Sequence, residues 1–256
     1  MTLSKDGRYI YCIIGTKQER NFGPIGLNGR EVLTIGYEDL AMVVSNHPLA
    51  KLVVNQDNMV AHEKVIEEVM KEFDGVLPVR YGTVAADADE IRNLLDRRRR
   101  EFKIALRDLD HKVELGVKGI WPDMDAIFKE VVKDNKAIKK LKEKIQNDGG
   151  TKNIPAKMEA GRMVEAALQK KKADEAEDIV EALRKASVNF KLNKTTGDNM
   201  FMNAAFLVDK GREKEFDNIM DDLGEKHKKR IKFLYAGPLP TFNFVNIAIY
   251  PEAWEK

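Results

Sequence analysis

Histidine and carboxylate side chains are the residues of this chain that could transfer protons or hold a metal, and they are scattered. The four histidines, His47, His62, His111 and His227, lie far apart, and none has a His or Cys neighbour at metal-ligand spacing. His62 and Glu63 are the best pair for general-base chemistry, which would require an oriented partner within hydrogen-bond reach. His62 also falls on the apolar stripe of a predicted helix. That position favours a core histidine hydrogen-bonded to the backbone, and a catalytic His62 is the alternative.

Two further stretches could bind anions. The glycine-rich segment Gly23–Gly29 lacks the Lys-Ser/Thr ending of a phosphate loop and a following helix, so a flexible connection is favoured. Arg97–Arg100 is a run of four cations that fans around most of a helical turn, with Arg98 beneath the apolar stripe. This run is typical of a solvated helix face, and an anion or partner site is the alternative.

Charge is also concentrated elsewhere. Lys129–Lys144 holds seven lysines against three acids, whereas Glu63–Glu72 is acidic. These opposed patches could attract each other within the molecule or between copies, and the sequence leaves both options open.

Composition excludes several classes of protein. In 256 residues, 44 Lys and Arg oppose 42 Asp and Glu, and a net charge of +2 argues against a dedicated nucleic-acid binder. Cys12 is the only cysteine, which excludes an intramolecular disulfide and a cysteine-based zinc cage. Met1–Asp6 lacks the apolar region of a signal peptide, and no stretch approaches the ~20 apolar residues of a membrane span. We therefore expect a soluble, cytoplasmic protein with no cofactor and no metal.

The segment Val76–Val84 organises the first part of the chain. Leu77, Val79 and Tyr81 share one face at period two, which predicts a half-buried strand. Pro78 cannot donate to a ladder, and Gly82 has no side chain to pack, so the strand is expected at a sheet edge or a bulge. Arg80 points away from the Leu77 face, toward an ion pair beneath a helix or toward a partner.

Around this segment we predict an α+β domain over residues 1–111. Its expected elements are a buried strand at Tyr9–Ile14, a loop at Gly15–Arg30, strands at Glu31–Ile35 and Leu40–Ser45 joined near Glu38-Asp39, a helix at Asn58–Phe73, and one helix from a capping box at Asp87 and Glu90 to Leu109.

Residues 112–256 are predicted as a second domain. A strand from Val113 to near Trp121-Pro122 and strands at Val188–Leu192, Met200–Val208 and Ile231–Tyr235 alternate with helices at Pro155–Lys185 and Phe216–Leu223, an order typical of a ferredoxin-like fold. A further helical stretch, Asp123–Gln146, ends at Asp148-Gly149-Gly150. The middle of the long helix, Gln169–Glu177, has few large apolar residues and must stand in water or bend. Gly237–Pro240 is expected to stop the sheet, and Phe242–Ile249 to form an extended tail.

Five segments, in this order and spacing, resemble the gas vesicle protein GvpF/GvpL family. They are Tyr9-Ile10-Tyr11-Cys12-Ile13-Ile14, the pair His62-Glu63, Leu77-Pro78-Val79-Arg80-Tyr81-Gly82-Thr83, Val113-Glu114-Leu115-Gly116-Val117-Lys118-Gly119-Ile120-Trp121, and Gly237-Pro238-Leu239-Pro240-Thr241-Phe242-Asn243-Phe244-Val245. Many members read Gly-Pro-Trp-Pro-Pro-Tyr-Ser-Phe in the last segment. Leu239, Thr241, Phe242 and Asn243 depart from that pattern, and the loss of the tyrosine hydroxyl suits a packing role.

The resemblance implies an accessory or minor structural protein of gas vesicles without enzymatic activity. It implies an N-terminal α+β domain followed by a ferredoxin-like domain with added helices, and binding to the small hydrophobic shell subunit GvpA and other accessory proteins. The expected place of action is the cytoplasm, in association with gas vesicles. No nucleic acid or membrane partner is expected.

Two strands with incompletely paired edges are the candidate partner-binding surfaces. Their residues are Pro78, Arg80 and Tyr81 in the first, and Pro238, Leu239, Pro240, Phe242 and Phe244 in the tail. Internal packing is the alternative for both. The rival function is a ferredoxin-like small-molecule enzyme or ligand sensor with a cleft near His62, Glu63 and Arg80, which a deep polar pocket joining the three would favour.

Overall fold

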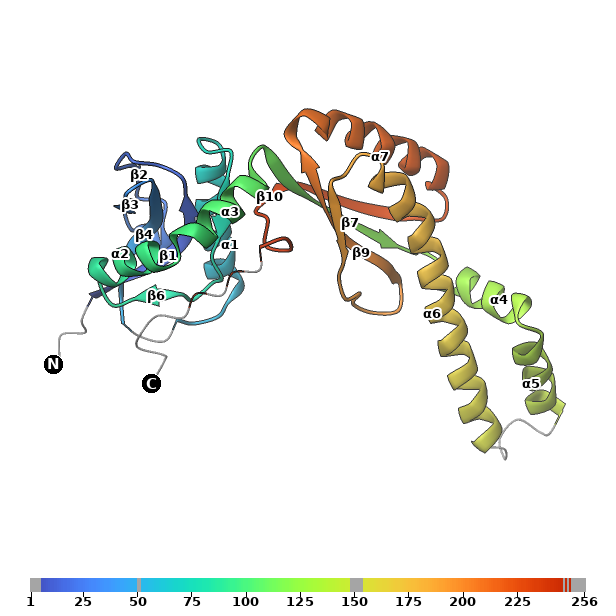
Figure 1. Ribbon diagram of the computed structural model, residues 1–256. Coiled ribbons are helices and arrows are strands. Elements are labelled where there is room, and N and C mark those ends of the chain that lie inside the picture. Colours follow the sequence, from blue (N-terminus) through green and yellow to red (C-terminus); the bar gives the residue numbers. More distant parts are fainter. Residues whose placement is uncertain (1–5, 50–51, 148–153, 246, 248, 250–256) are drawn as a thin grey trace. The chain divides into compact units, whose positions relative to one another are not determined.

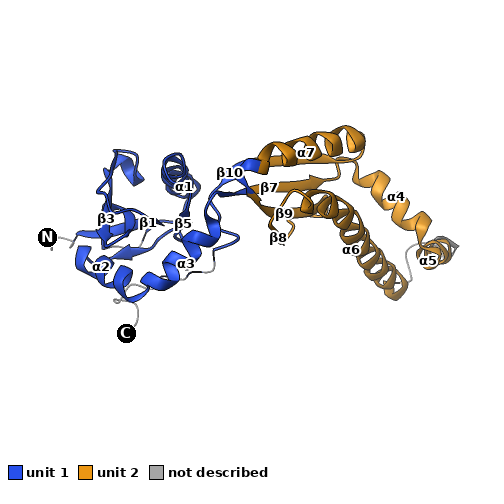
Figure 2. Ribbon diagram, turned by 45° about the horizontal axis from the view of Figure 1, so that its top comes forward, with its two compact units in different colours: residues 1–114, 209–211, 237–256 blue, residues 115–208, 212–236 orange. Residues whose placement is uncertain are grey.

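In the computed structural model, the described residues are 6–49, 52–147, 154–245, 247 and 249. The chain forms two compact units, which Figure 2 colours separately. Unit 1 comprises residues 1–114, 209–211 and 237–256, and unit 2 comprises residues 115–208 and 212–236. The tail was expected in the second domain, whereas its described residues group with unit 1.

Unit 1 is built on a six-stranded sheet with β1 (Asp6–Ile14) near its centre (Figure 1). The order is β2-β3-β4-β1-β5, and β6 also pairs with β1. Every side chain from Tyr9 to Ile14 is fully buried, which confirms the predicted buried strand. The other strands are β2 (Asn21–Gly23), β3 (Val32–Tyr37), β4 (Leu40–Pro48), β5 (Val76–Pro78) and β6 (Val84–Ala85).

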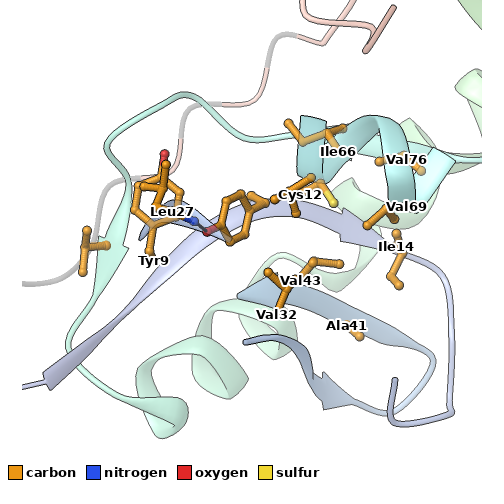
Figure 3. Close-up of a cluster of buried hydrophobic side chains, with 13 residues drawn as sticks. Tyr9, Cys12, Ile14, Leu27, Val32, Ala41, Val43, Ile66, Val69 and Val76 are labelled. Carbon is orange, nitrogen blue, oxygen red and sulfur yellow. Dashed lines mark hydrogen bonds between the residues drawn. The ribbon is translucent and has the colours of Figure 1, made fainter. Parts of the chain in front are cut away.

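Helices cover both faces of this sheet. Figure 2 shows α1 (Gln56–Met70) on one face, and α2 (Ala88–Arg97) and α3 (Arg99–Leu109) on the other. On the α1 side, Ile66 and Val69 belong to one buried cluster with Cys12 of β1 and Val43 of β4 (Figure 3). Because apolar burial is the main source of folding free energy, this cluster holds α1 in register on the sheet.

The predicted single helix up to Leu109 is two helices. At Arg98 the backbone leaves the helical region (φ −108°, ψ 16°), although no proline or glycine is present. The break lets α2 pack on β3 and β4 while α3 packs on β5. The Arg98 guanidinium lies 5.1 Å from the centre of the Phe102 ring, so its predicted place beneath the apolar stripe is confirmed.

Two other predictions for unit 1 need correction. The Val76–Val84 strand is interrupted: β5 ends at Pro78, and a turn with Gly82 at φ +91° precedes β6. β5 does lie at the end of the sheet, as predicted. The predicted Gly15–Arg30 loop contains β2 and a 3-10 turn at Leu27–Gly29. This turn is held to the sheet because the Leu27 N–H donates to the buried Tyr11 hydroxyl at 2.9 Å.

Unit 2 contains most of a four-stranded sheet in the order β10-β7-β9-β8. Its strands are β7 (Lys112–Ile120), β8 (Asn189–Leu192), β9 (Met200–Asp209) and β10 (Lys232–Leu239). β10 runs through Gly237-Pro238, which was expected to stop the sheet. A proline that cannot donate is tolerated there because β10 is an edge strand.

The helices of unit 2 are α4 (Met124–Asp134), α5 (Lys136–Asn147), α6 (Ile154–Arg184) and α7 (Glu213–His227). Figure 1 shows α4 and α5 lying beside α6, and all three pack on one another. The predicted helical stretch Asp123–Gln146 is therefore split at Asn135. Its predicted end at residues 148–150 lies outside the described residues.

An ion cluster joins α4 and α6 to the segment before β10. The Arg230 guanidinium donates to both carboxylate oxygens of Glu130 at 2.7 and 2.9 Å, and to Glu175. Trp121 Nε1 donates to Glu175 at 2.8 Å, and Lys171 pairs with Glu130 at 3.0 Å. In the middle of α6, which was expected to stand in water or bend, Lys171 and Glu175 belong to this cluster, whereas Gln169, Lys170, Asp174 and Glu177 are exposed to solvent.

Candidate functional site

Two of the segments that carry the family resemblance meet at His62. This side chain is 2% exposed, and both ring nitrogens are hydrogen-bonded. Nε2 lies 2.9 Å from the Val79 carbonyl oxygen, and Nδ1 lies 2.8 Å from the Tyr9 hydroxyl. Because a carbonyl can only accept, Nε2 carries the proton and Nδ1 accepts from Tyr9. The Tyr9 oxygen in turn accepts the N–H of Gly82 at 3.2 Å.

Burial keeps this histidine neutral. It lowers the pKa of His62 from 6.5 to about 4, against the weaker opposite effect of the Val79 carbonyl. Burial likewise raises the pKa of Tyr9 and of Cys12, so neither ionises near neutral pH. His62 therefore acts in this structure as a bridge between α1, β1 and the turn after β5.

Aromatic rings surround the bridge. His62 stacks on Tyr11 with ring centres 5.5 Å apart, and it meets Tyr81 edge-on at 5.8 Å. Phe242 of the tail approaches His62 at 6.3 Å. The sequence pattern linked none of these three aromatic residues to His62, since they come from three separate stretches of the chain. Only the apolar-stripe position of His62 pointed to a buried role.

The turn after β5 presents residues to solvent. Arg80 is exposed, and among the described residues no ion pair or side-chain hydrogen bond holds its guanidinium. Tyr81 is half-buried and donates its hydroxyl proton to the Val53 carbonyl at 2.7 Å. Val53 and its neighbour Val54 are 67% and 74% exposed. We call Val53, Val54, Arg80 and Phe242 the Arg80–Phe242 surface.

From Thr241 to Val245 the tail folds as a turn, and not as the start of the extended segment that was expected. The N–H groups of Phe244 and Val245 both donate to the Thr241 carbonyl, at 3.0 and 3.1 Å. Asn243 donates its backbone N–H and its side-chain amide to the carboxylate of Glu114, at 3.0 and 2.6 Å. Glu114 is 4% exposed, so the tail supplies donors to a buried carboxylate. Asn246 and Ala248, within the predicted tail, lie outside the described residues.

Thr241 is the weak point of this turn. Its side chain is 4% exposed, and its hydroxyl oxygen is buried without a hydrogen-bond partner in the described structure. We expect Thr241→Val to raise the free energy of unfolding by about 1 kcal/mol, because it removes an unsatisfied buried hydroxyl at nearly constant volume. Chemical denaturation of both proteins measures the difference. A destabilised Thr241→Val variant would show that the hydroxyl has a partner in solution.

The predicted partner-binding residues fall into three groups by burial. Pro78 and Pro240 are buried, which makes them packing residues in this structure. Tyr81, Leu239 and Phe244 are half-buried, whereas Arg80, Pro238 and Phe242 are exposed, Phe242 to 38%. Contact with a partner therefore stays a prediction for the exposed group.

The rival hypothesis of a cleft near His62, Glu63 and Arg80 concerns three side chains that differ in burial: His62 is buried, Glu63 is half-buried and Arg80 is exposed. Glu63 is half-buried, and burial raises the pKa of its carboxyl, with Glu67 adding to the effect. Three hollows on the described surface have volumes of ≈ 530, ≈ 610 and ≈ 650 Å³. They are lined by residues of α2 to α6, and not by His62, Glu63 or Arg80.

Within the described ranges, no group of three His, Cys, Asp or Glu side chains is placed to hold a metal ion. No helix in those same ranges combines the length and hydropathy needed to cross a membrane.

The fold and the site define a mixed α+β protein of two compact units, with a buried histidine that joins a sheet, a helix and a tail turn. A family model described as gas vesicle synthesis protein GvpL/GvpF matches residues 7–246, and the chain belongs to this family. The resemblance drawn from the five segments is thereby confirmed.

Individual relatives agree with this assignment. Gas vesicle protein F of Streptomyces sp. (strain CB03234) is 30% identical over 240 residues, 93% of this chain and 98% of the relative. Gas vesicle protein F1 of Halobacterium salinarum is 26% identical over 95% of both chains. The crystal structure of GvpF from Anabaena sp. PCC7120 matches with a TM-score of 0.82 at 21% identity, and covers 95% of this chain and 100% of that one. The GvpF structure from Microcystis aeruginosa gives 0.79.

Proposed function

We propose that this protein is an accessory or minor structural protein of gas vesicles that acts in vesicle assembly by binding the small hydrophobic shell subunit GvpA and other accessory proteins. Membership of the GvpL/GvpF family over residues 7–246 is the observation that carries the proposal. We further propose that it works in the cytoplasm, in association with gas vesicles, and catalyses no reaction.

The Arg80–Phe242 surface is the proposed contact with the shell subunit. A subunit that polymerises into a hydrophobic wall exposes apolar surface before it is incorporated, and a partner can cover that surface. Val53, Val54 and Phe242 offer exposed apolar area, and Arg80 adds an exposed cation that can pair with a carboxylate. Arginine and aromatic side chains are enriched among residues that dominate interface energies.

We also propose that the second predicted domain is ferredoxin-like. In chain order its strands are β7, β8, β9 and β10, and the sheet places the fourth beside the first, followed by the third and the second. The helices α6 and α7 occupy the two crossover positions, and α4 with α5 are the added helices. The proposal includes the predicted division of the chain into two independently folding domains, residues 1–111 and 112–256.

The variant Arg80→Ala with Phe242→Ser tests the surface. We expect at least about a tenfold weaker affinity for purified, solubilised GvpA, since loss of a cation and of an aromatic contact each costs about 1 kcal/mol or more. Isothermal titration calorimetry with the full chain measures the affinity, and circular dichroism confirms that the variant is folded. Phe128→Ser with Lys129→Ala is the matched control, because Phe128 is 37% exposed on α4.

Unchanged affinity in the folded double variant, or equal weakening in the α4 control, would refute the proposed surface. Deletion in a vesicle-forming host, scored by electron microscopy, tests the wider role. Normal vesicles in number and shape would contradict it.

A further inference from the structure

The outer side of α2 and α3 is strongly cationic. Between Arg97 and Arg107 the chain has six basic residues and one acidic residue. Because the helix axis breaks at Arg98, the last turn of α2 and the first turns of α3 enclose a hollow of ≈ 650 Å³. The hollow is lined by Asp96, Ile104 and five cations, and we call these cations the basic face: Arg97, Arg99, Arg100, Lys103 and Arg107.

One internal carboxylate orders part of this face. Arg99 donates to Asp39 Oδ1 through two N–H groups, at 2.9 and 2.7 Å, and Lys103 donates to Asp39 Oδ2 at 2.6 Å. These two cations hold the pKa of Asp39 at about 2, so the carboxylate remains charged at any ordinary pH. The pair of cations is thus pre-positioned, and its two positive charges are offset by a single negative one.

Two other cations, Arg100 and Arg107, are less neutralised. Within the described part of the chain, Arg107 pairs only with its exposed neighbour Asp108, at 3.1 and 3.3 Å. Among the described residues, Arg100 has no ion pair or hydrogen bond from its guanidinium. A surplus of positive charge therefore faces solvent on α3.

An apolar side chain stands in the middle of these cations. Ile104 is 42% exposed, four residues after Arg100 and three before Arg107. Residues at these spacings lie on one face of a helix. The hollow thus combines an apolar centre with guanidinium groups on both sides along the helix axis.

We propose that the basic face is a docking site for an acidic amphipathic helix of a protein partner. The partner's apolar side chain would pack on Ile104, and its carboxylates would pair with Arg100 and Arg107. Guanidinium groups suit this role because they bind carboxylates in a planar, two-pronged geometry. This inference is independent of the proposed shell contact, since α3 covers the sheet face opposite α1, the helix that carries His62.

Other occupants fit the face less well. A nucleic acid would find no aromatic side chain in the hollow for base stacking, and a net charge of +2 gives the chain little general attraction for it. A second copy has two acidic helices to offer, α1 and α7, and the apolar stripe of each is already buried in its own fold, at Ile66 and Val69 on α1 and at Phe216 and Met220 on α7. Two of the α1-side carboxylates are already paired there, Glu68 with Lys71 and Glu72 with Arg20.

Fluorescence anisotropy with the full chain tests the docking site. The probe is a labelled synthetic helix of about 18 residues with a leucine stripe flanked by glutamates, in about 0.15 M salt. The comparison probes are the same helix with glutamine in place of glutamate, and a single-stranded DNA of about 20 nucleotides. We expect the acidic helix to bind at least about tenfold more tightly than either.

Three variants locate the site. Arg100→Gln with Arg107→Gln and, separately, Ile104→Asn should each weaken binding of the acidic helix by about tenfold or more. Lys129→Gln with Lys133→Gln is the matched control, because these lysines line the ≈ 610 Å³ hollow of unit 2 and the charge change is the same. The control should bind like the unmodified protein.

Several results would overturn the inference. They are equal weakening in the control, no weakening in the Arg100 and Arg107 variant, and DNA binding as tight as that of the acidic helix. Sedimentation equilibrium provides a last check: self-association that the Arg100 and Arg107 substitutions abolish would assign the face to a second copy instead.

Discussion

Replacing His62 by alanine is expected to lower the free energy of unfolding by about 3–5 kcal/mol. The substitution leaves the Val79 carbonyl and the Tyr9 hydroxyl buried without their partner, at about 1–3 kcal/mol each, and opens a cavity beneath α1. Urea denaturation followed by circular dichroism measures the change. Glu63→Gln on the same helix is the control and should change stability by less than about 0.5 kcal/mol.

The same residue predicts a dependence on pH. Its pKa is about 4 in the folded chain and 6.5 in a model peptide, so the unfolded chain binds a proton more readily. The stabilising contribution is complete above pH 6.5 and is lost as the pH falls from 6.5 toward 4, by about 3 kcal/mol in total. The His62→Ala variant should lack this part of the slope. Equal slopes in both proteins between these pH values would rule out a neutral buried histidine.

Replacing Arg230 by methionine is expected to loosen the helices of unit 2. Among the described residues, only the charge of Lys171 would then compensate Glu130 and Glu175, which costs about 1–3 kcal/mol when the 34% exposure of Arg230 is considered. Hydrogen exchange should show faster exchange of amide protons in α4 and α6 than in α1. The pattern is informative because a general loss of stability would accelerate the exchange of amide protons in both units.

Lowering the pH is expected to weaken the same ion cluster. Arg230, assisted by Lys171, lowers the pKa of Glu130 from 4.5 to about 2. This carboxylate therefore stabilises the fold above pH 4.5, and the contribution is lost as the pH falls from 4.5 toward 2. The Arg230→Met variant should lose less stability in that window than the unmodified protein. Lys185→Met, at an exposed position after α6, is the matched control, and it should behave like the unmodified protein.

Local patterns were sufficient to predict most helices and strands. Period-two and period-3.6 spacing placed β1, β4, α1 and α7 within a few residues of their observed bounds. Such patterns report which face of an element is apolar, and they do not report where an element must bend to follow its neighbours. The breaks at Arg98 and Asn135 arise from packing against a sheet or another helix, and for that reason the sequence predicted continuous helices.

The candidate site was predictable only in part. The Pro78 strand was correctly placed at a sheet edge, since a proline lacks the N–H that an interior ladder needs. The links from His62 to Tyr9, and from Asn243 to Glu114, join residues more than fifty positions apart in the chain. No spacing rule connects such residues, and only the folded sheet brings their polar atoms together. The tail was predicted as a strand because alternating Phe242 and Phe244 imitate one, whereas Thr241 forms a turn there.

The bond between Asn243 and Glu114 has a consequence for how the molecule is made. Unit 1 is discontinuous along the polypeptide, with the whole of unit 2 inserted between its first long segment and its last. A nascent chain stopped at residue 236 would contain every strand of the first sheet, yet the carboxylate of Glu114 would lack the two donors of Asn243. A stretch synthesised after the whole of unit 2 therefore completes the unit to which residues 1–114 belong.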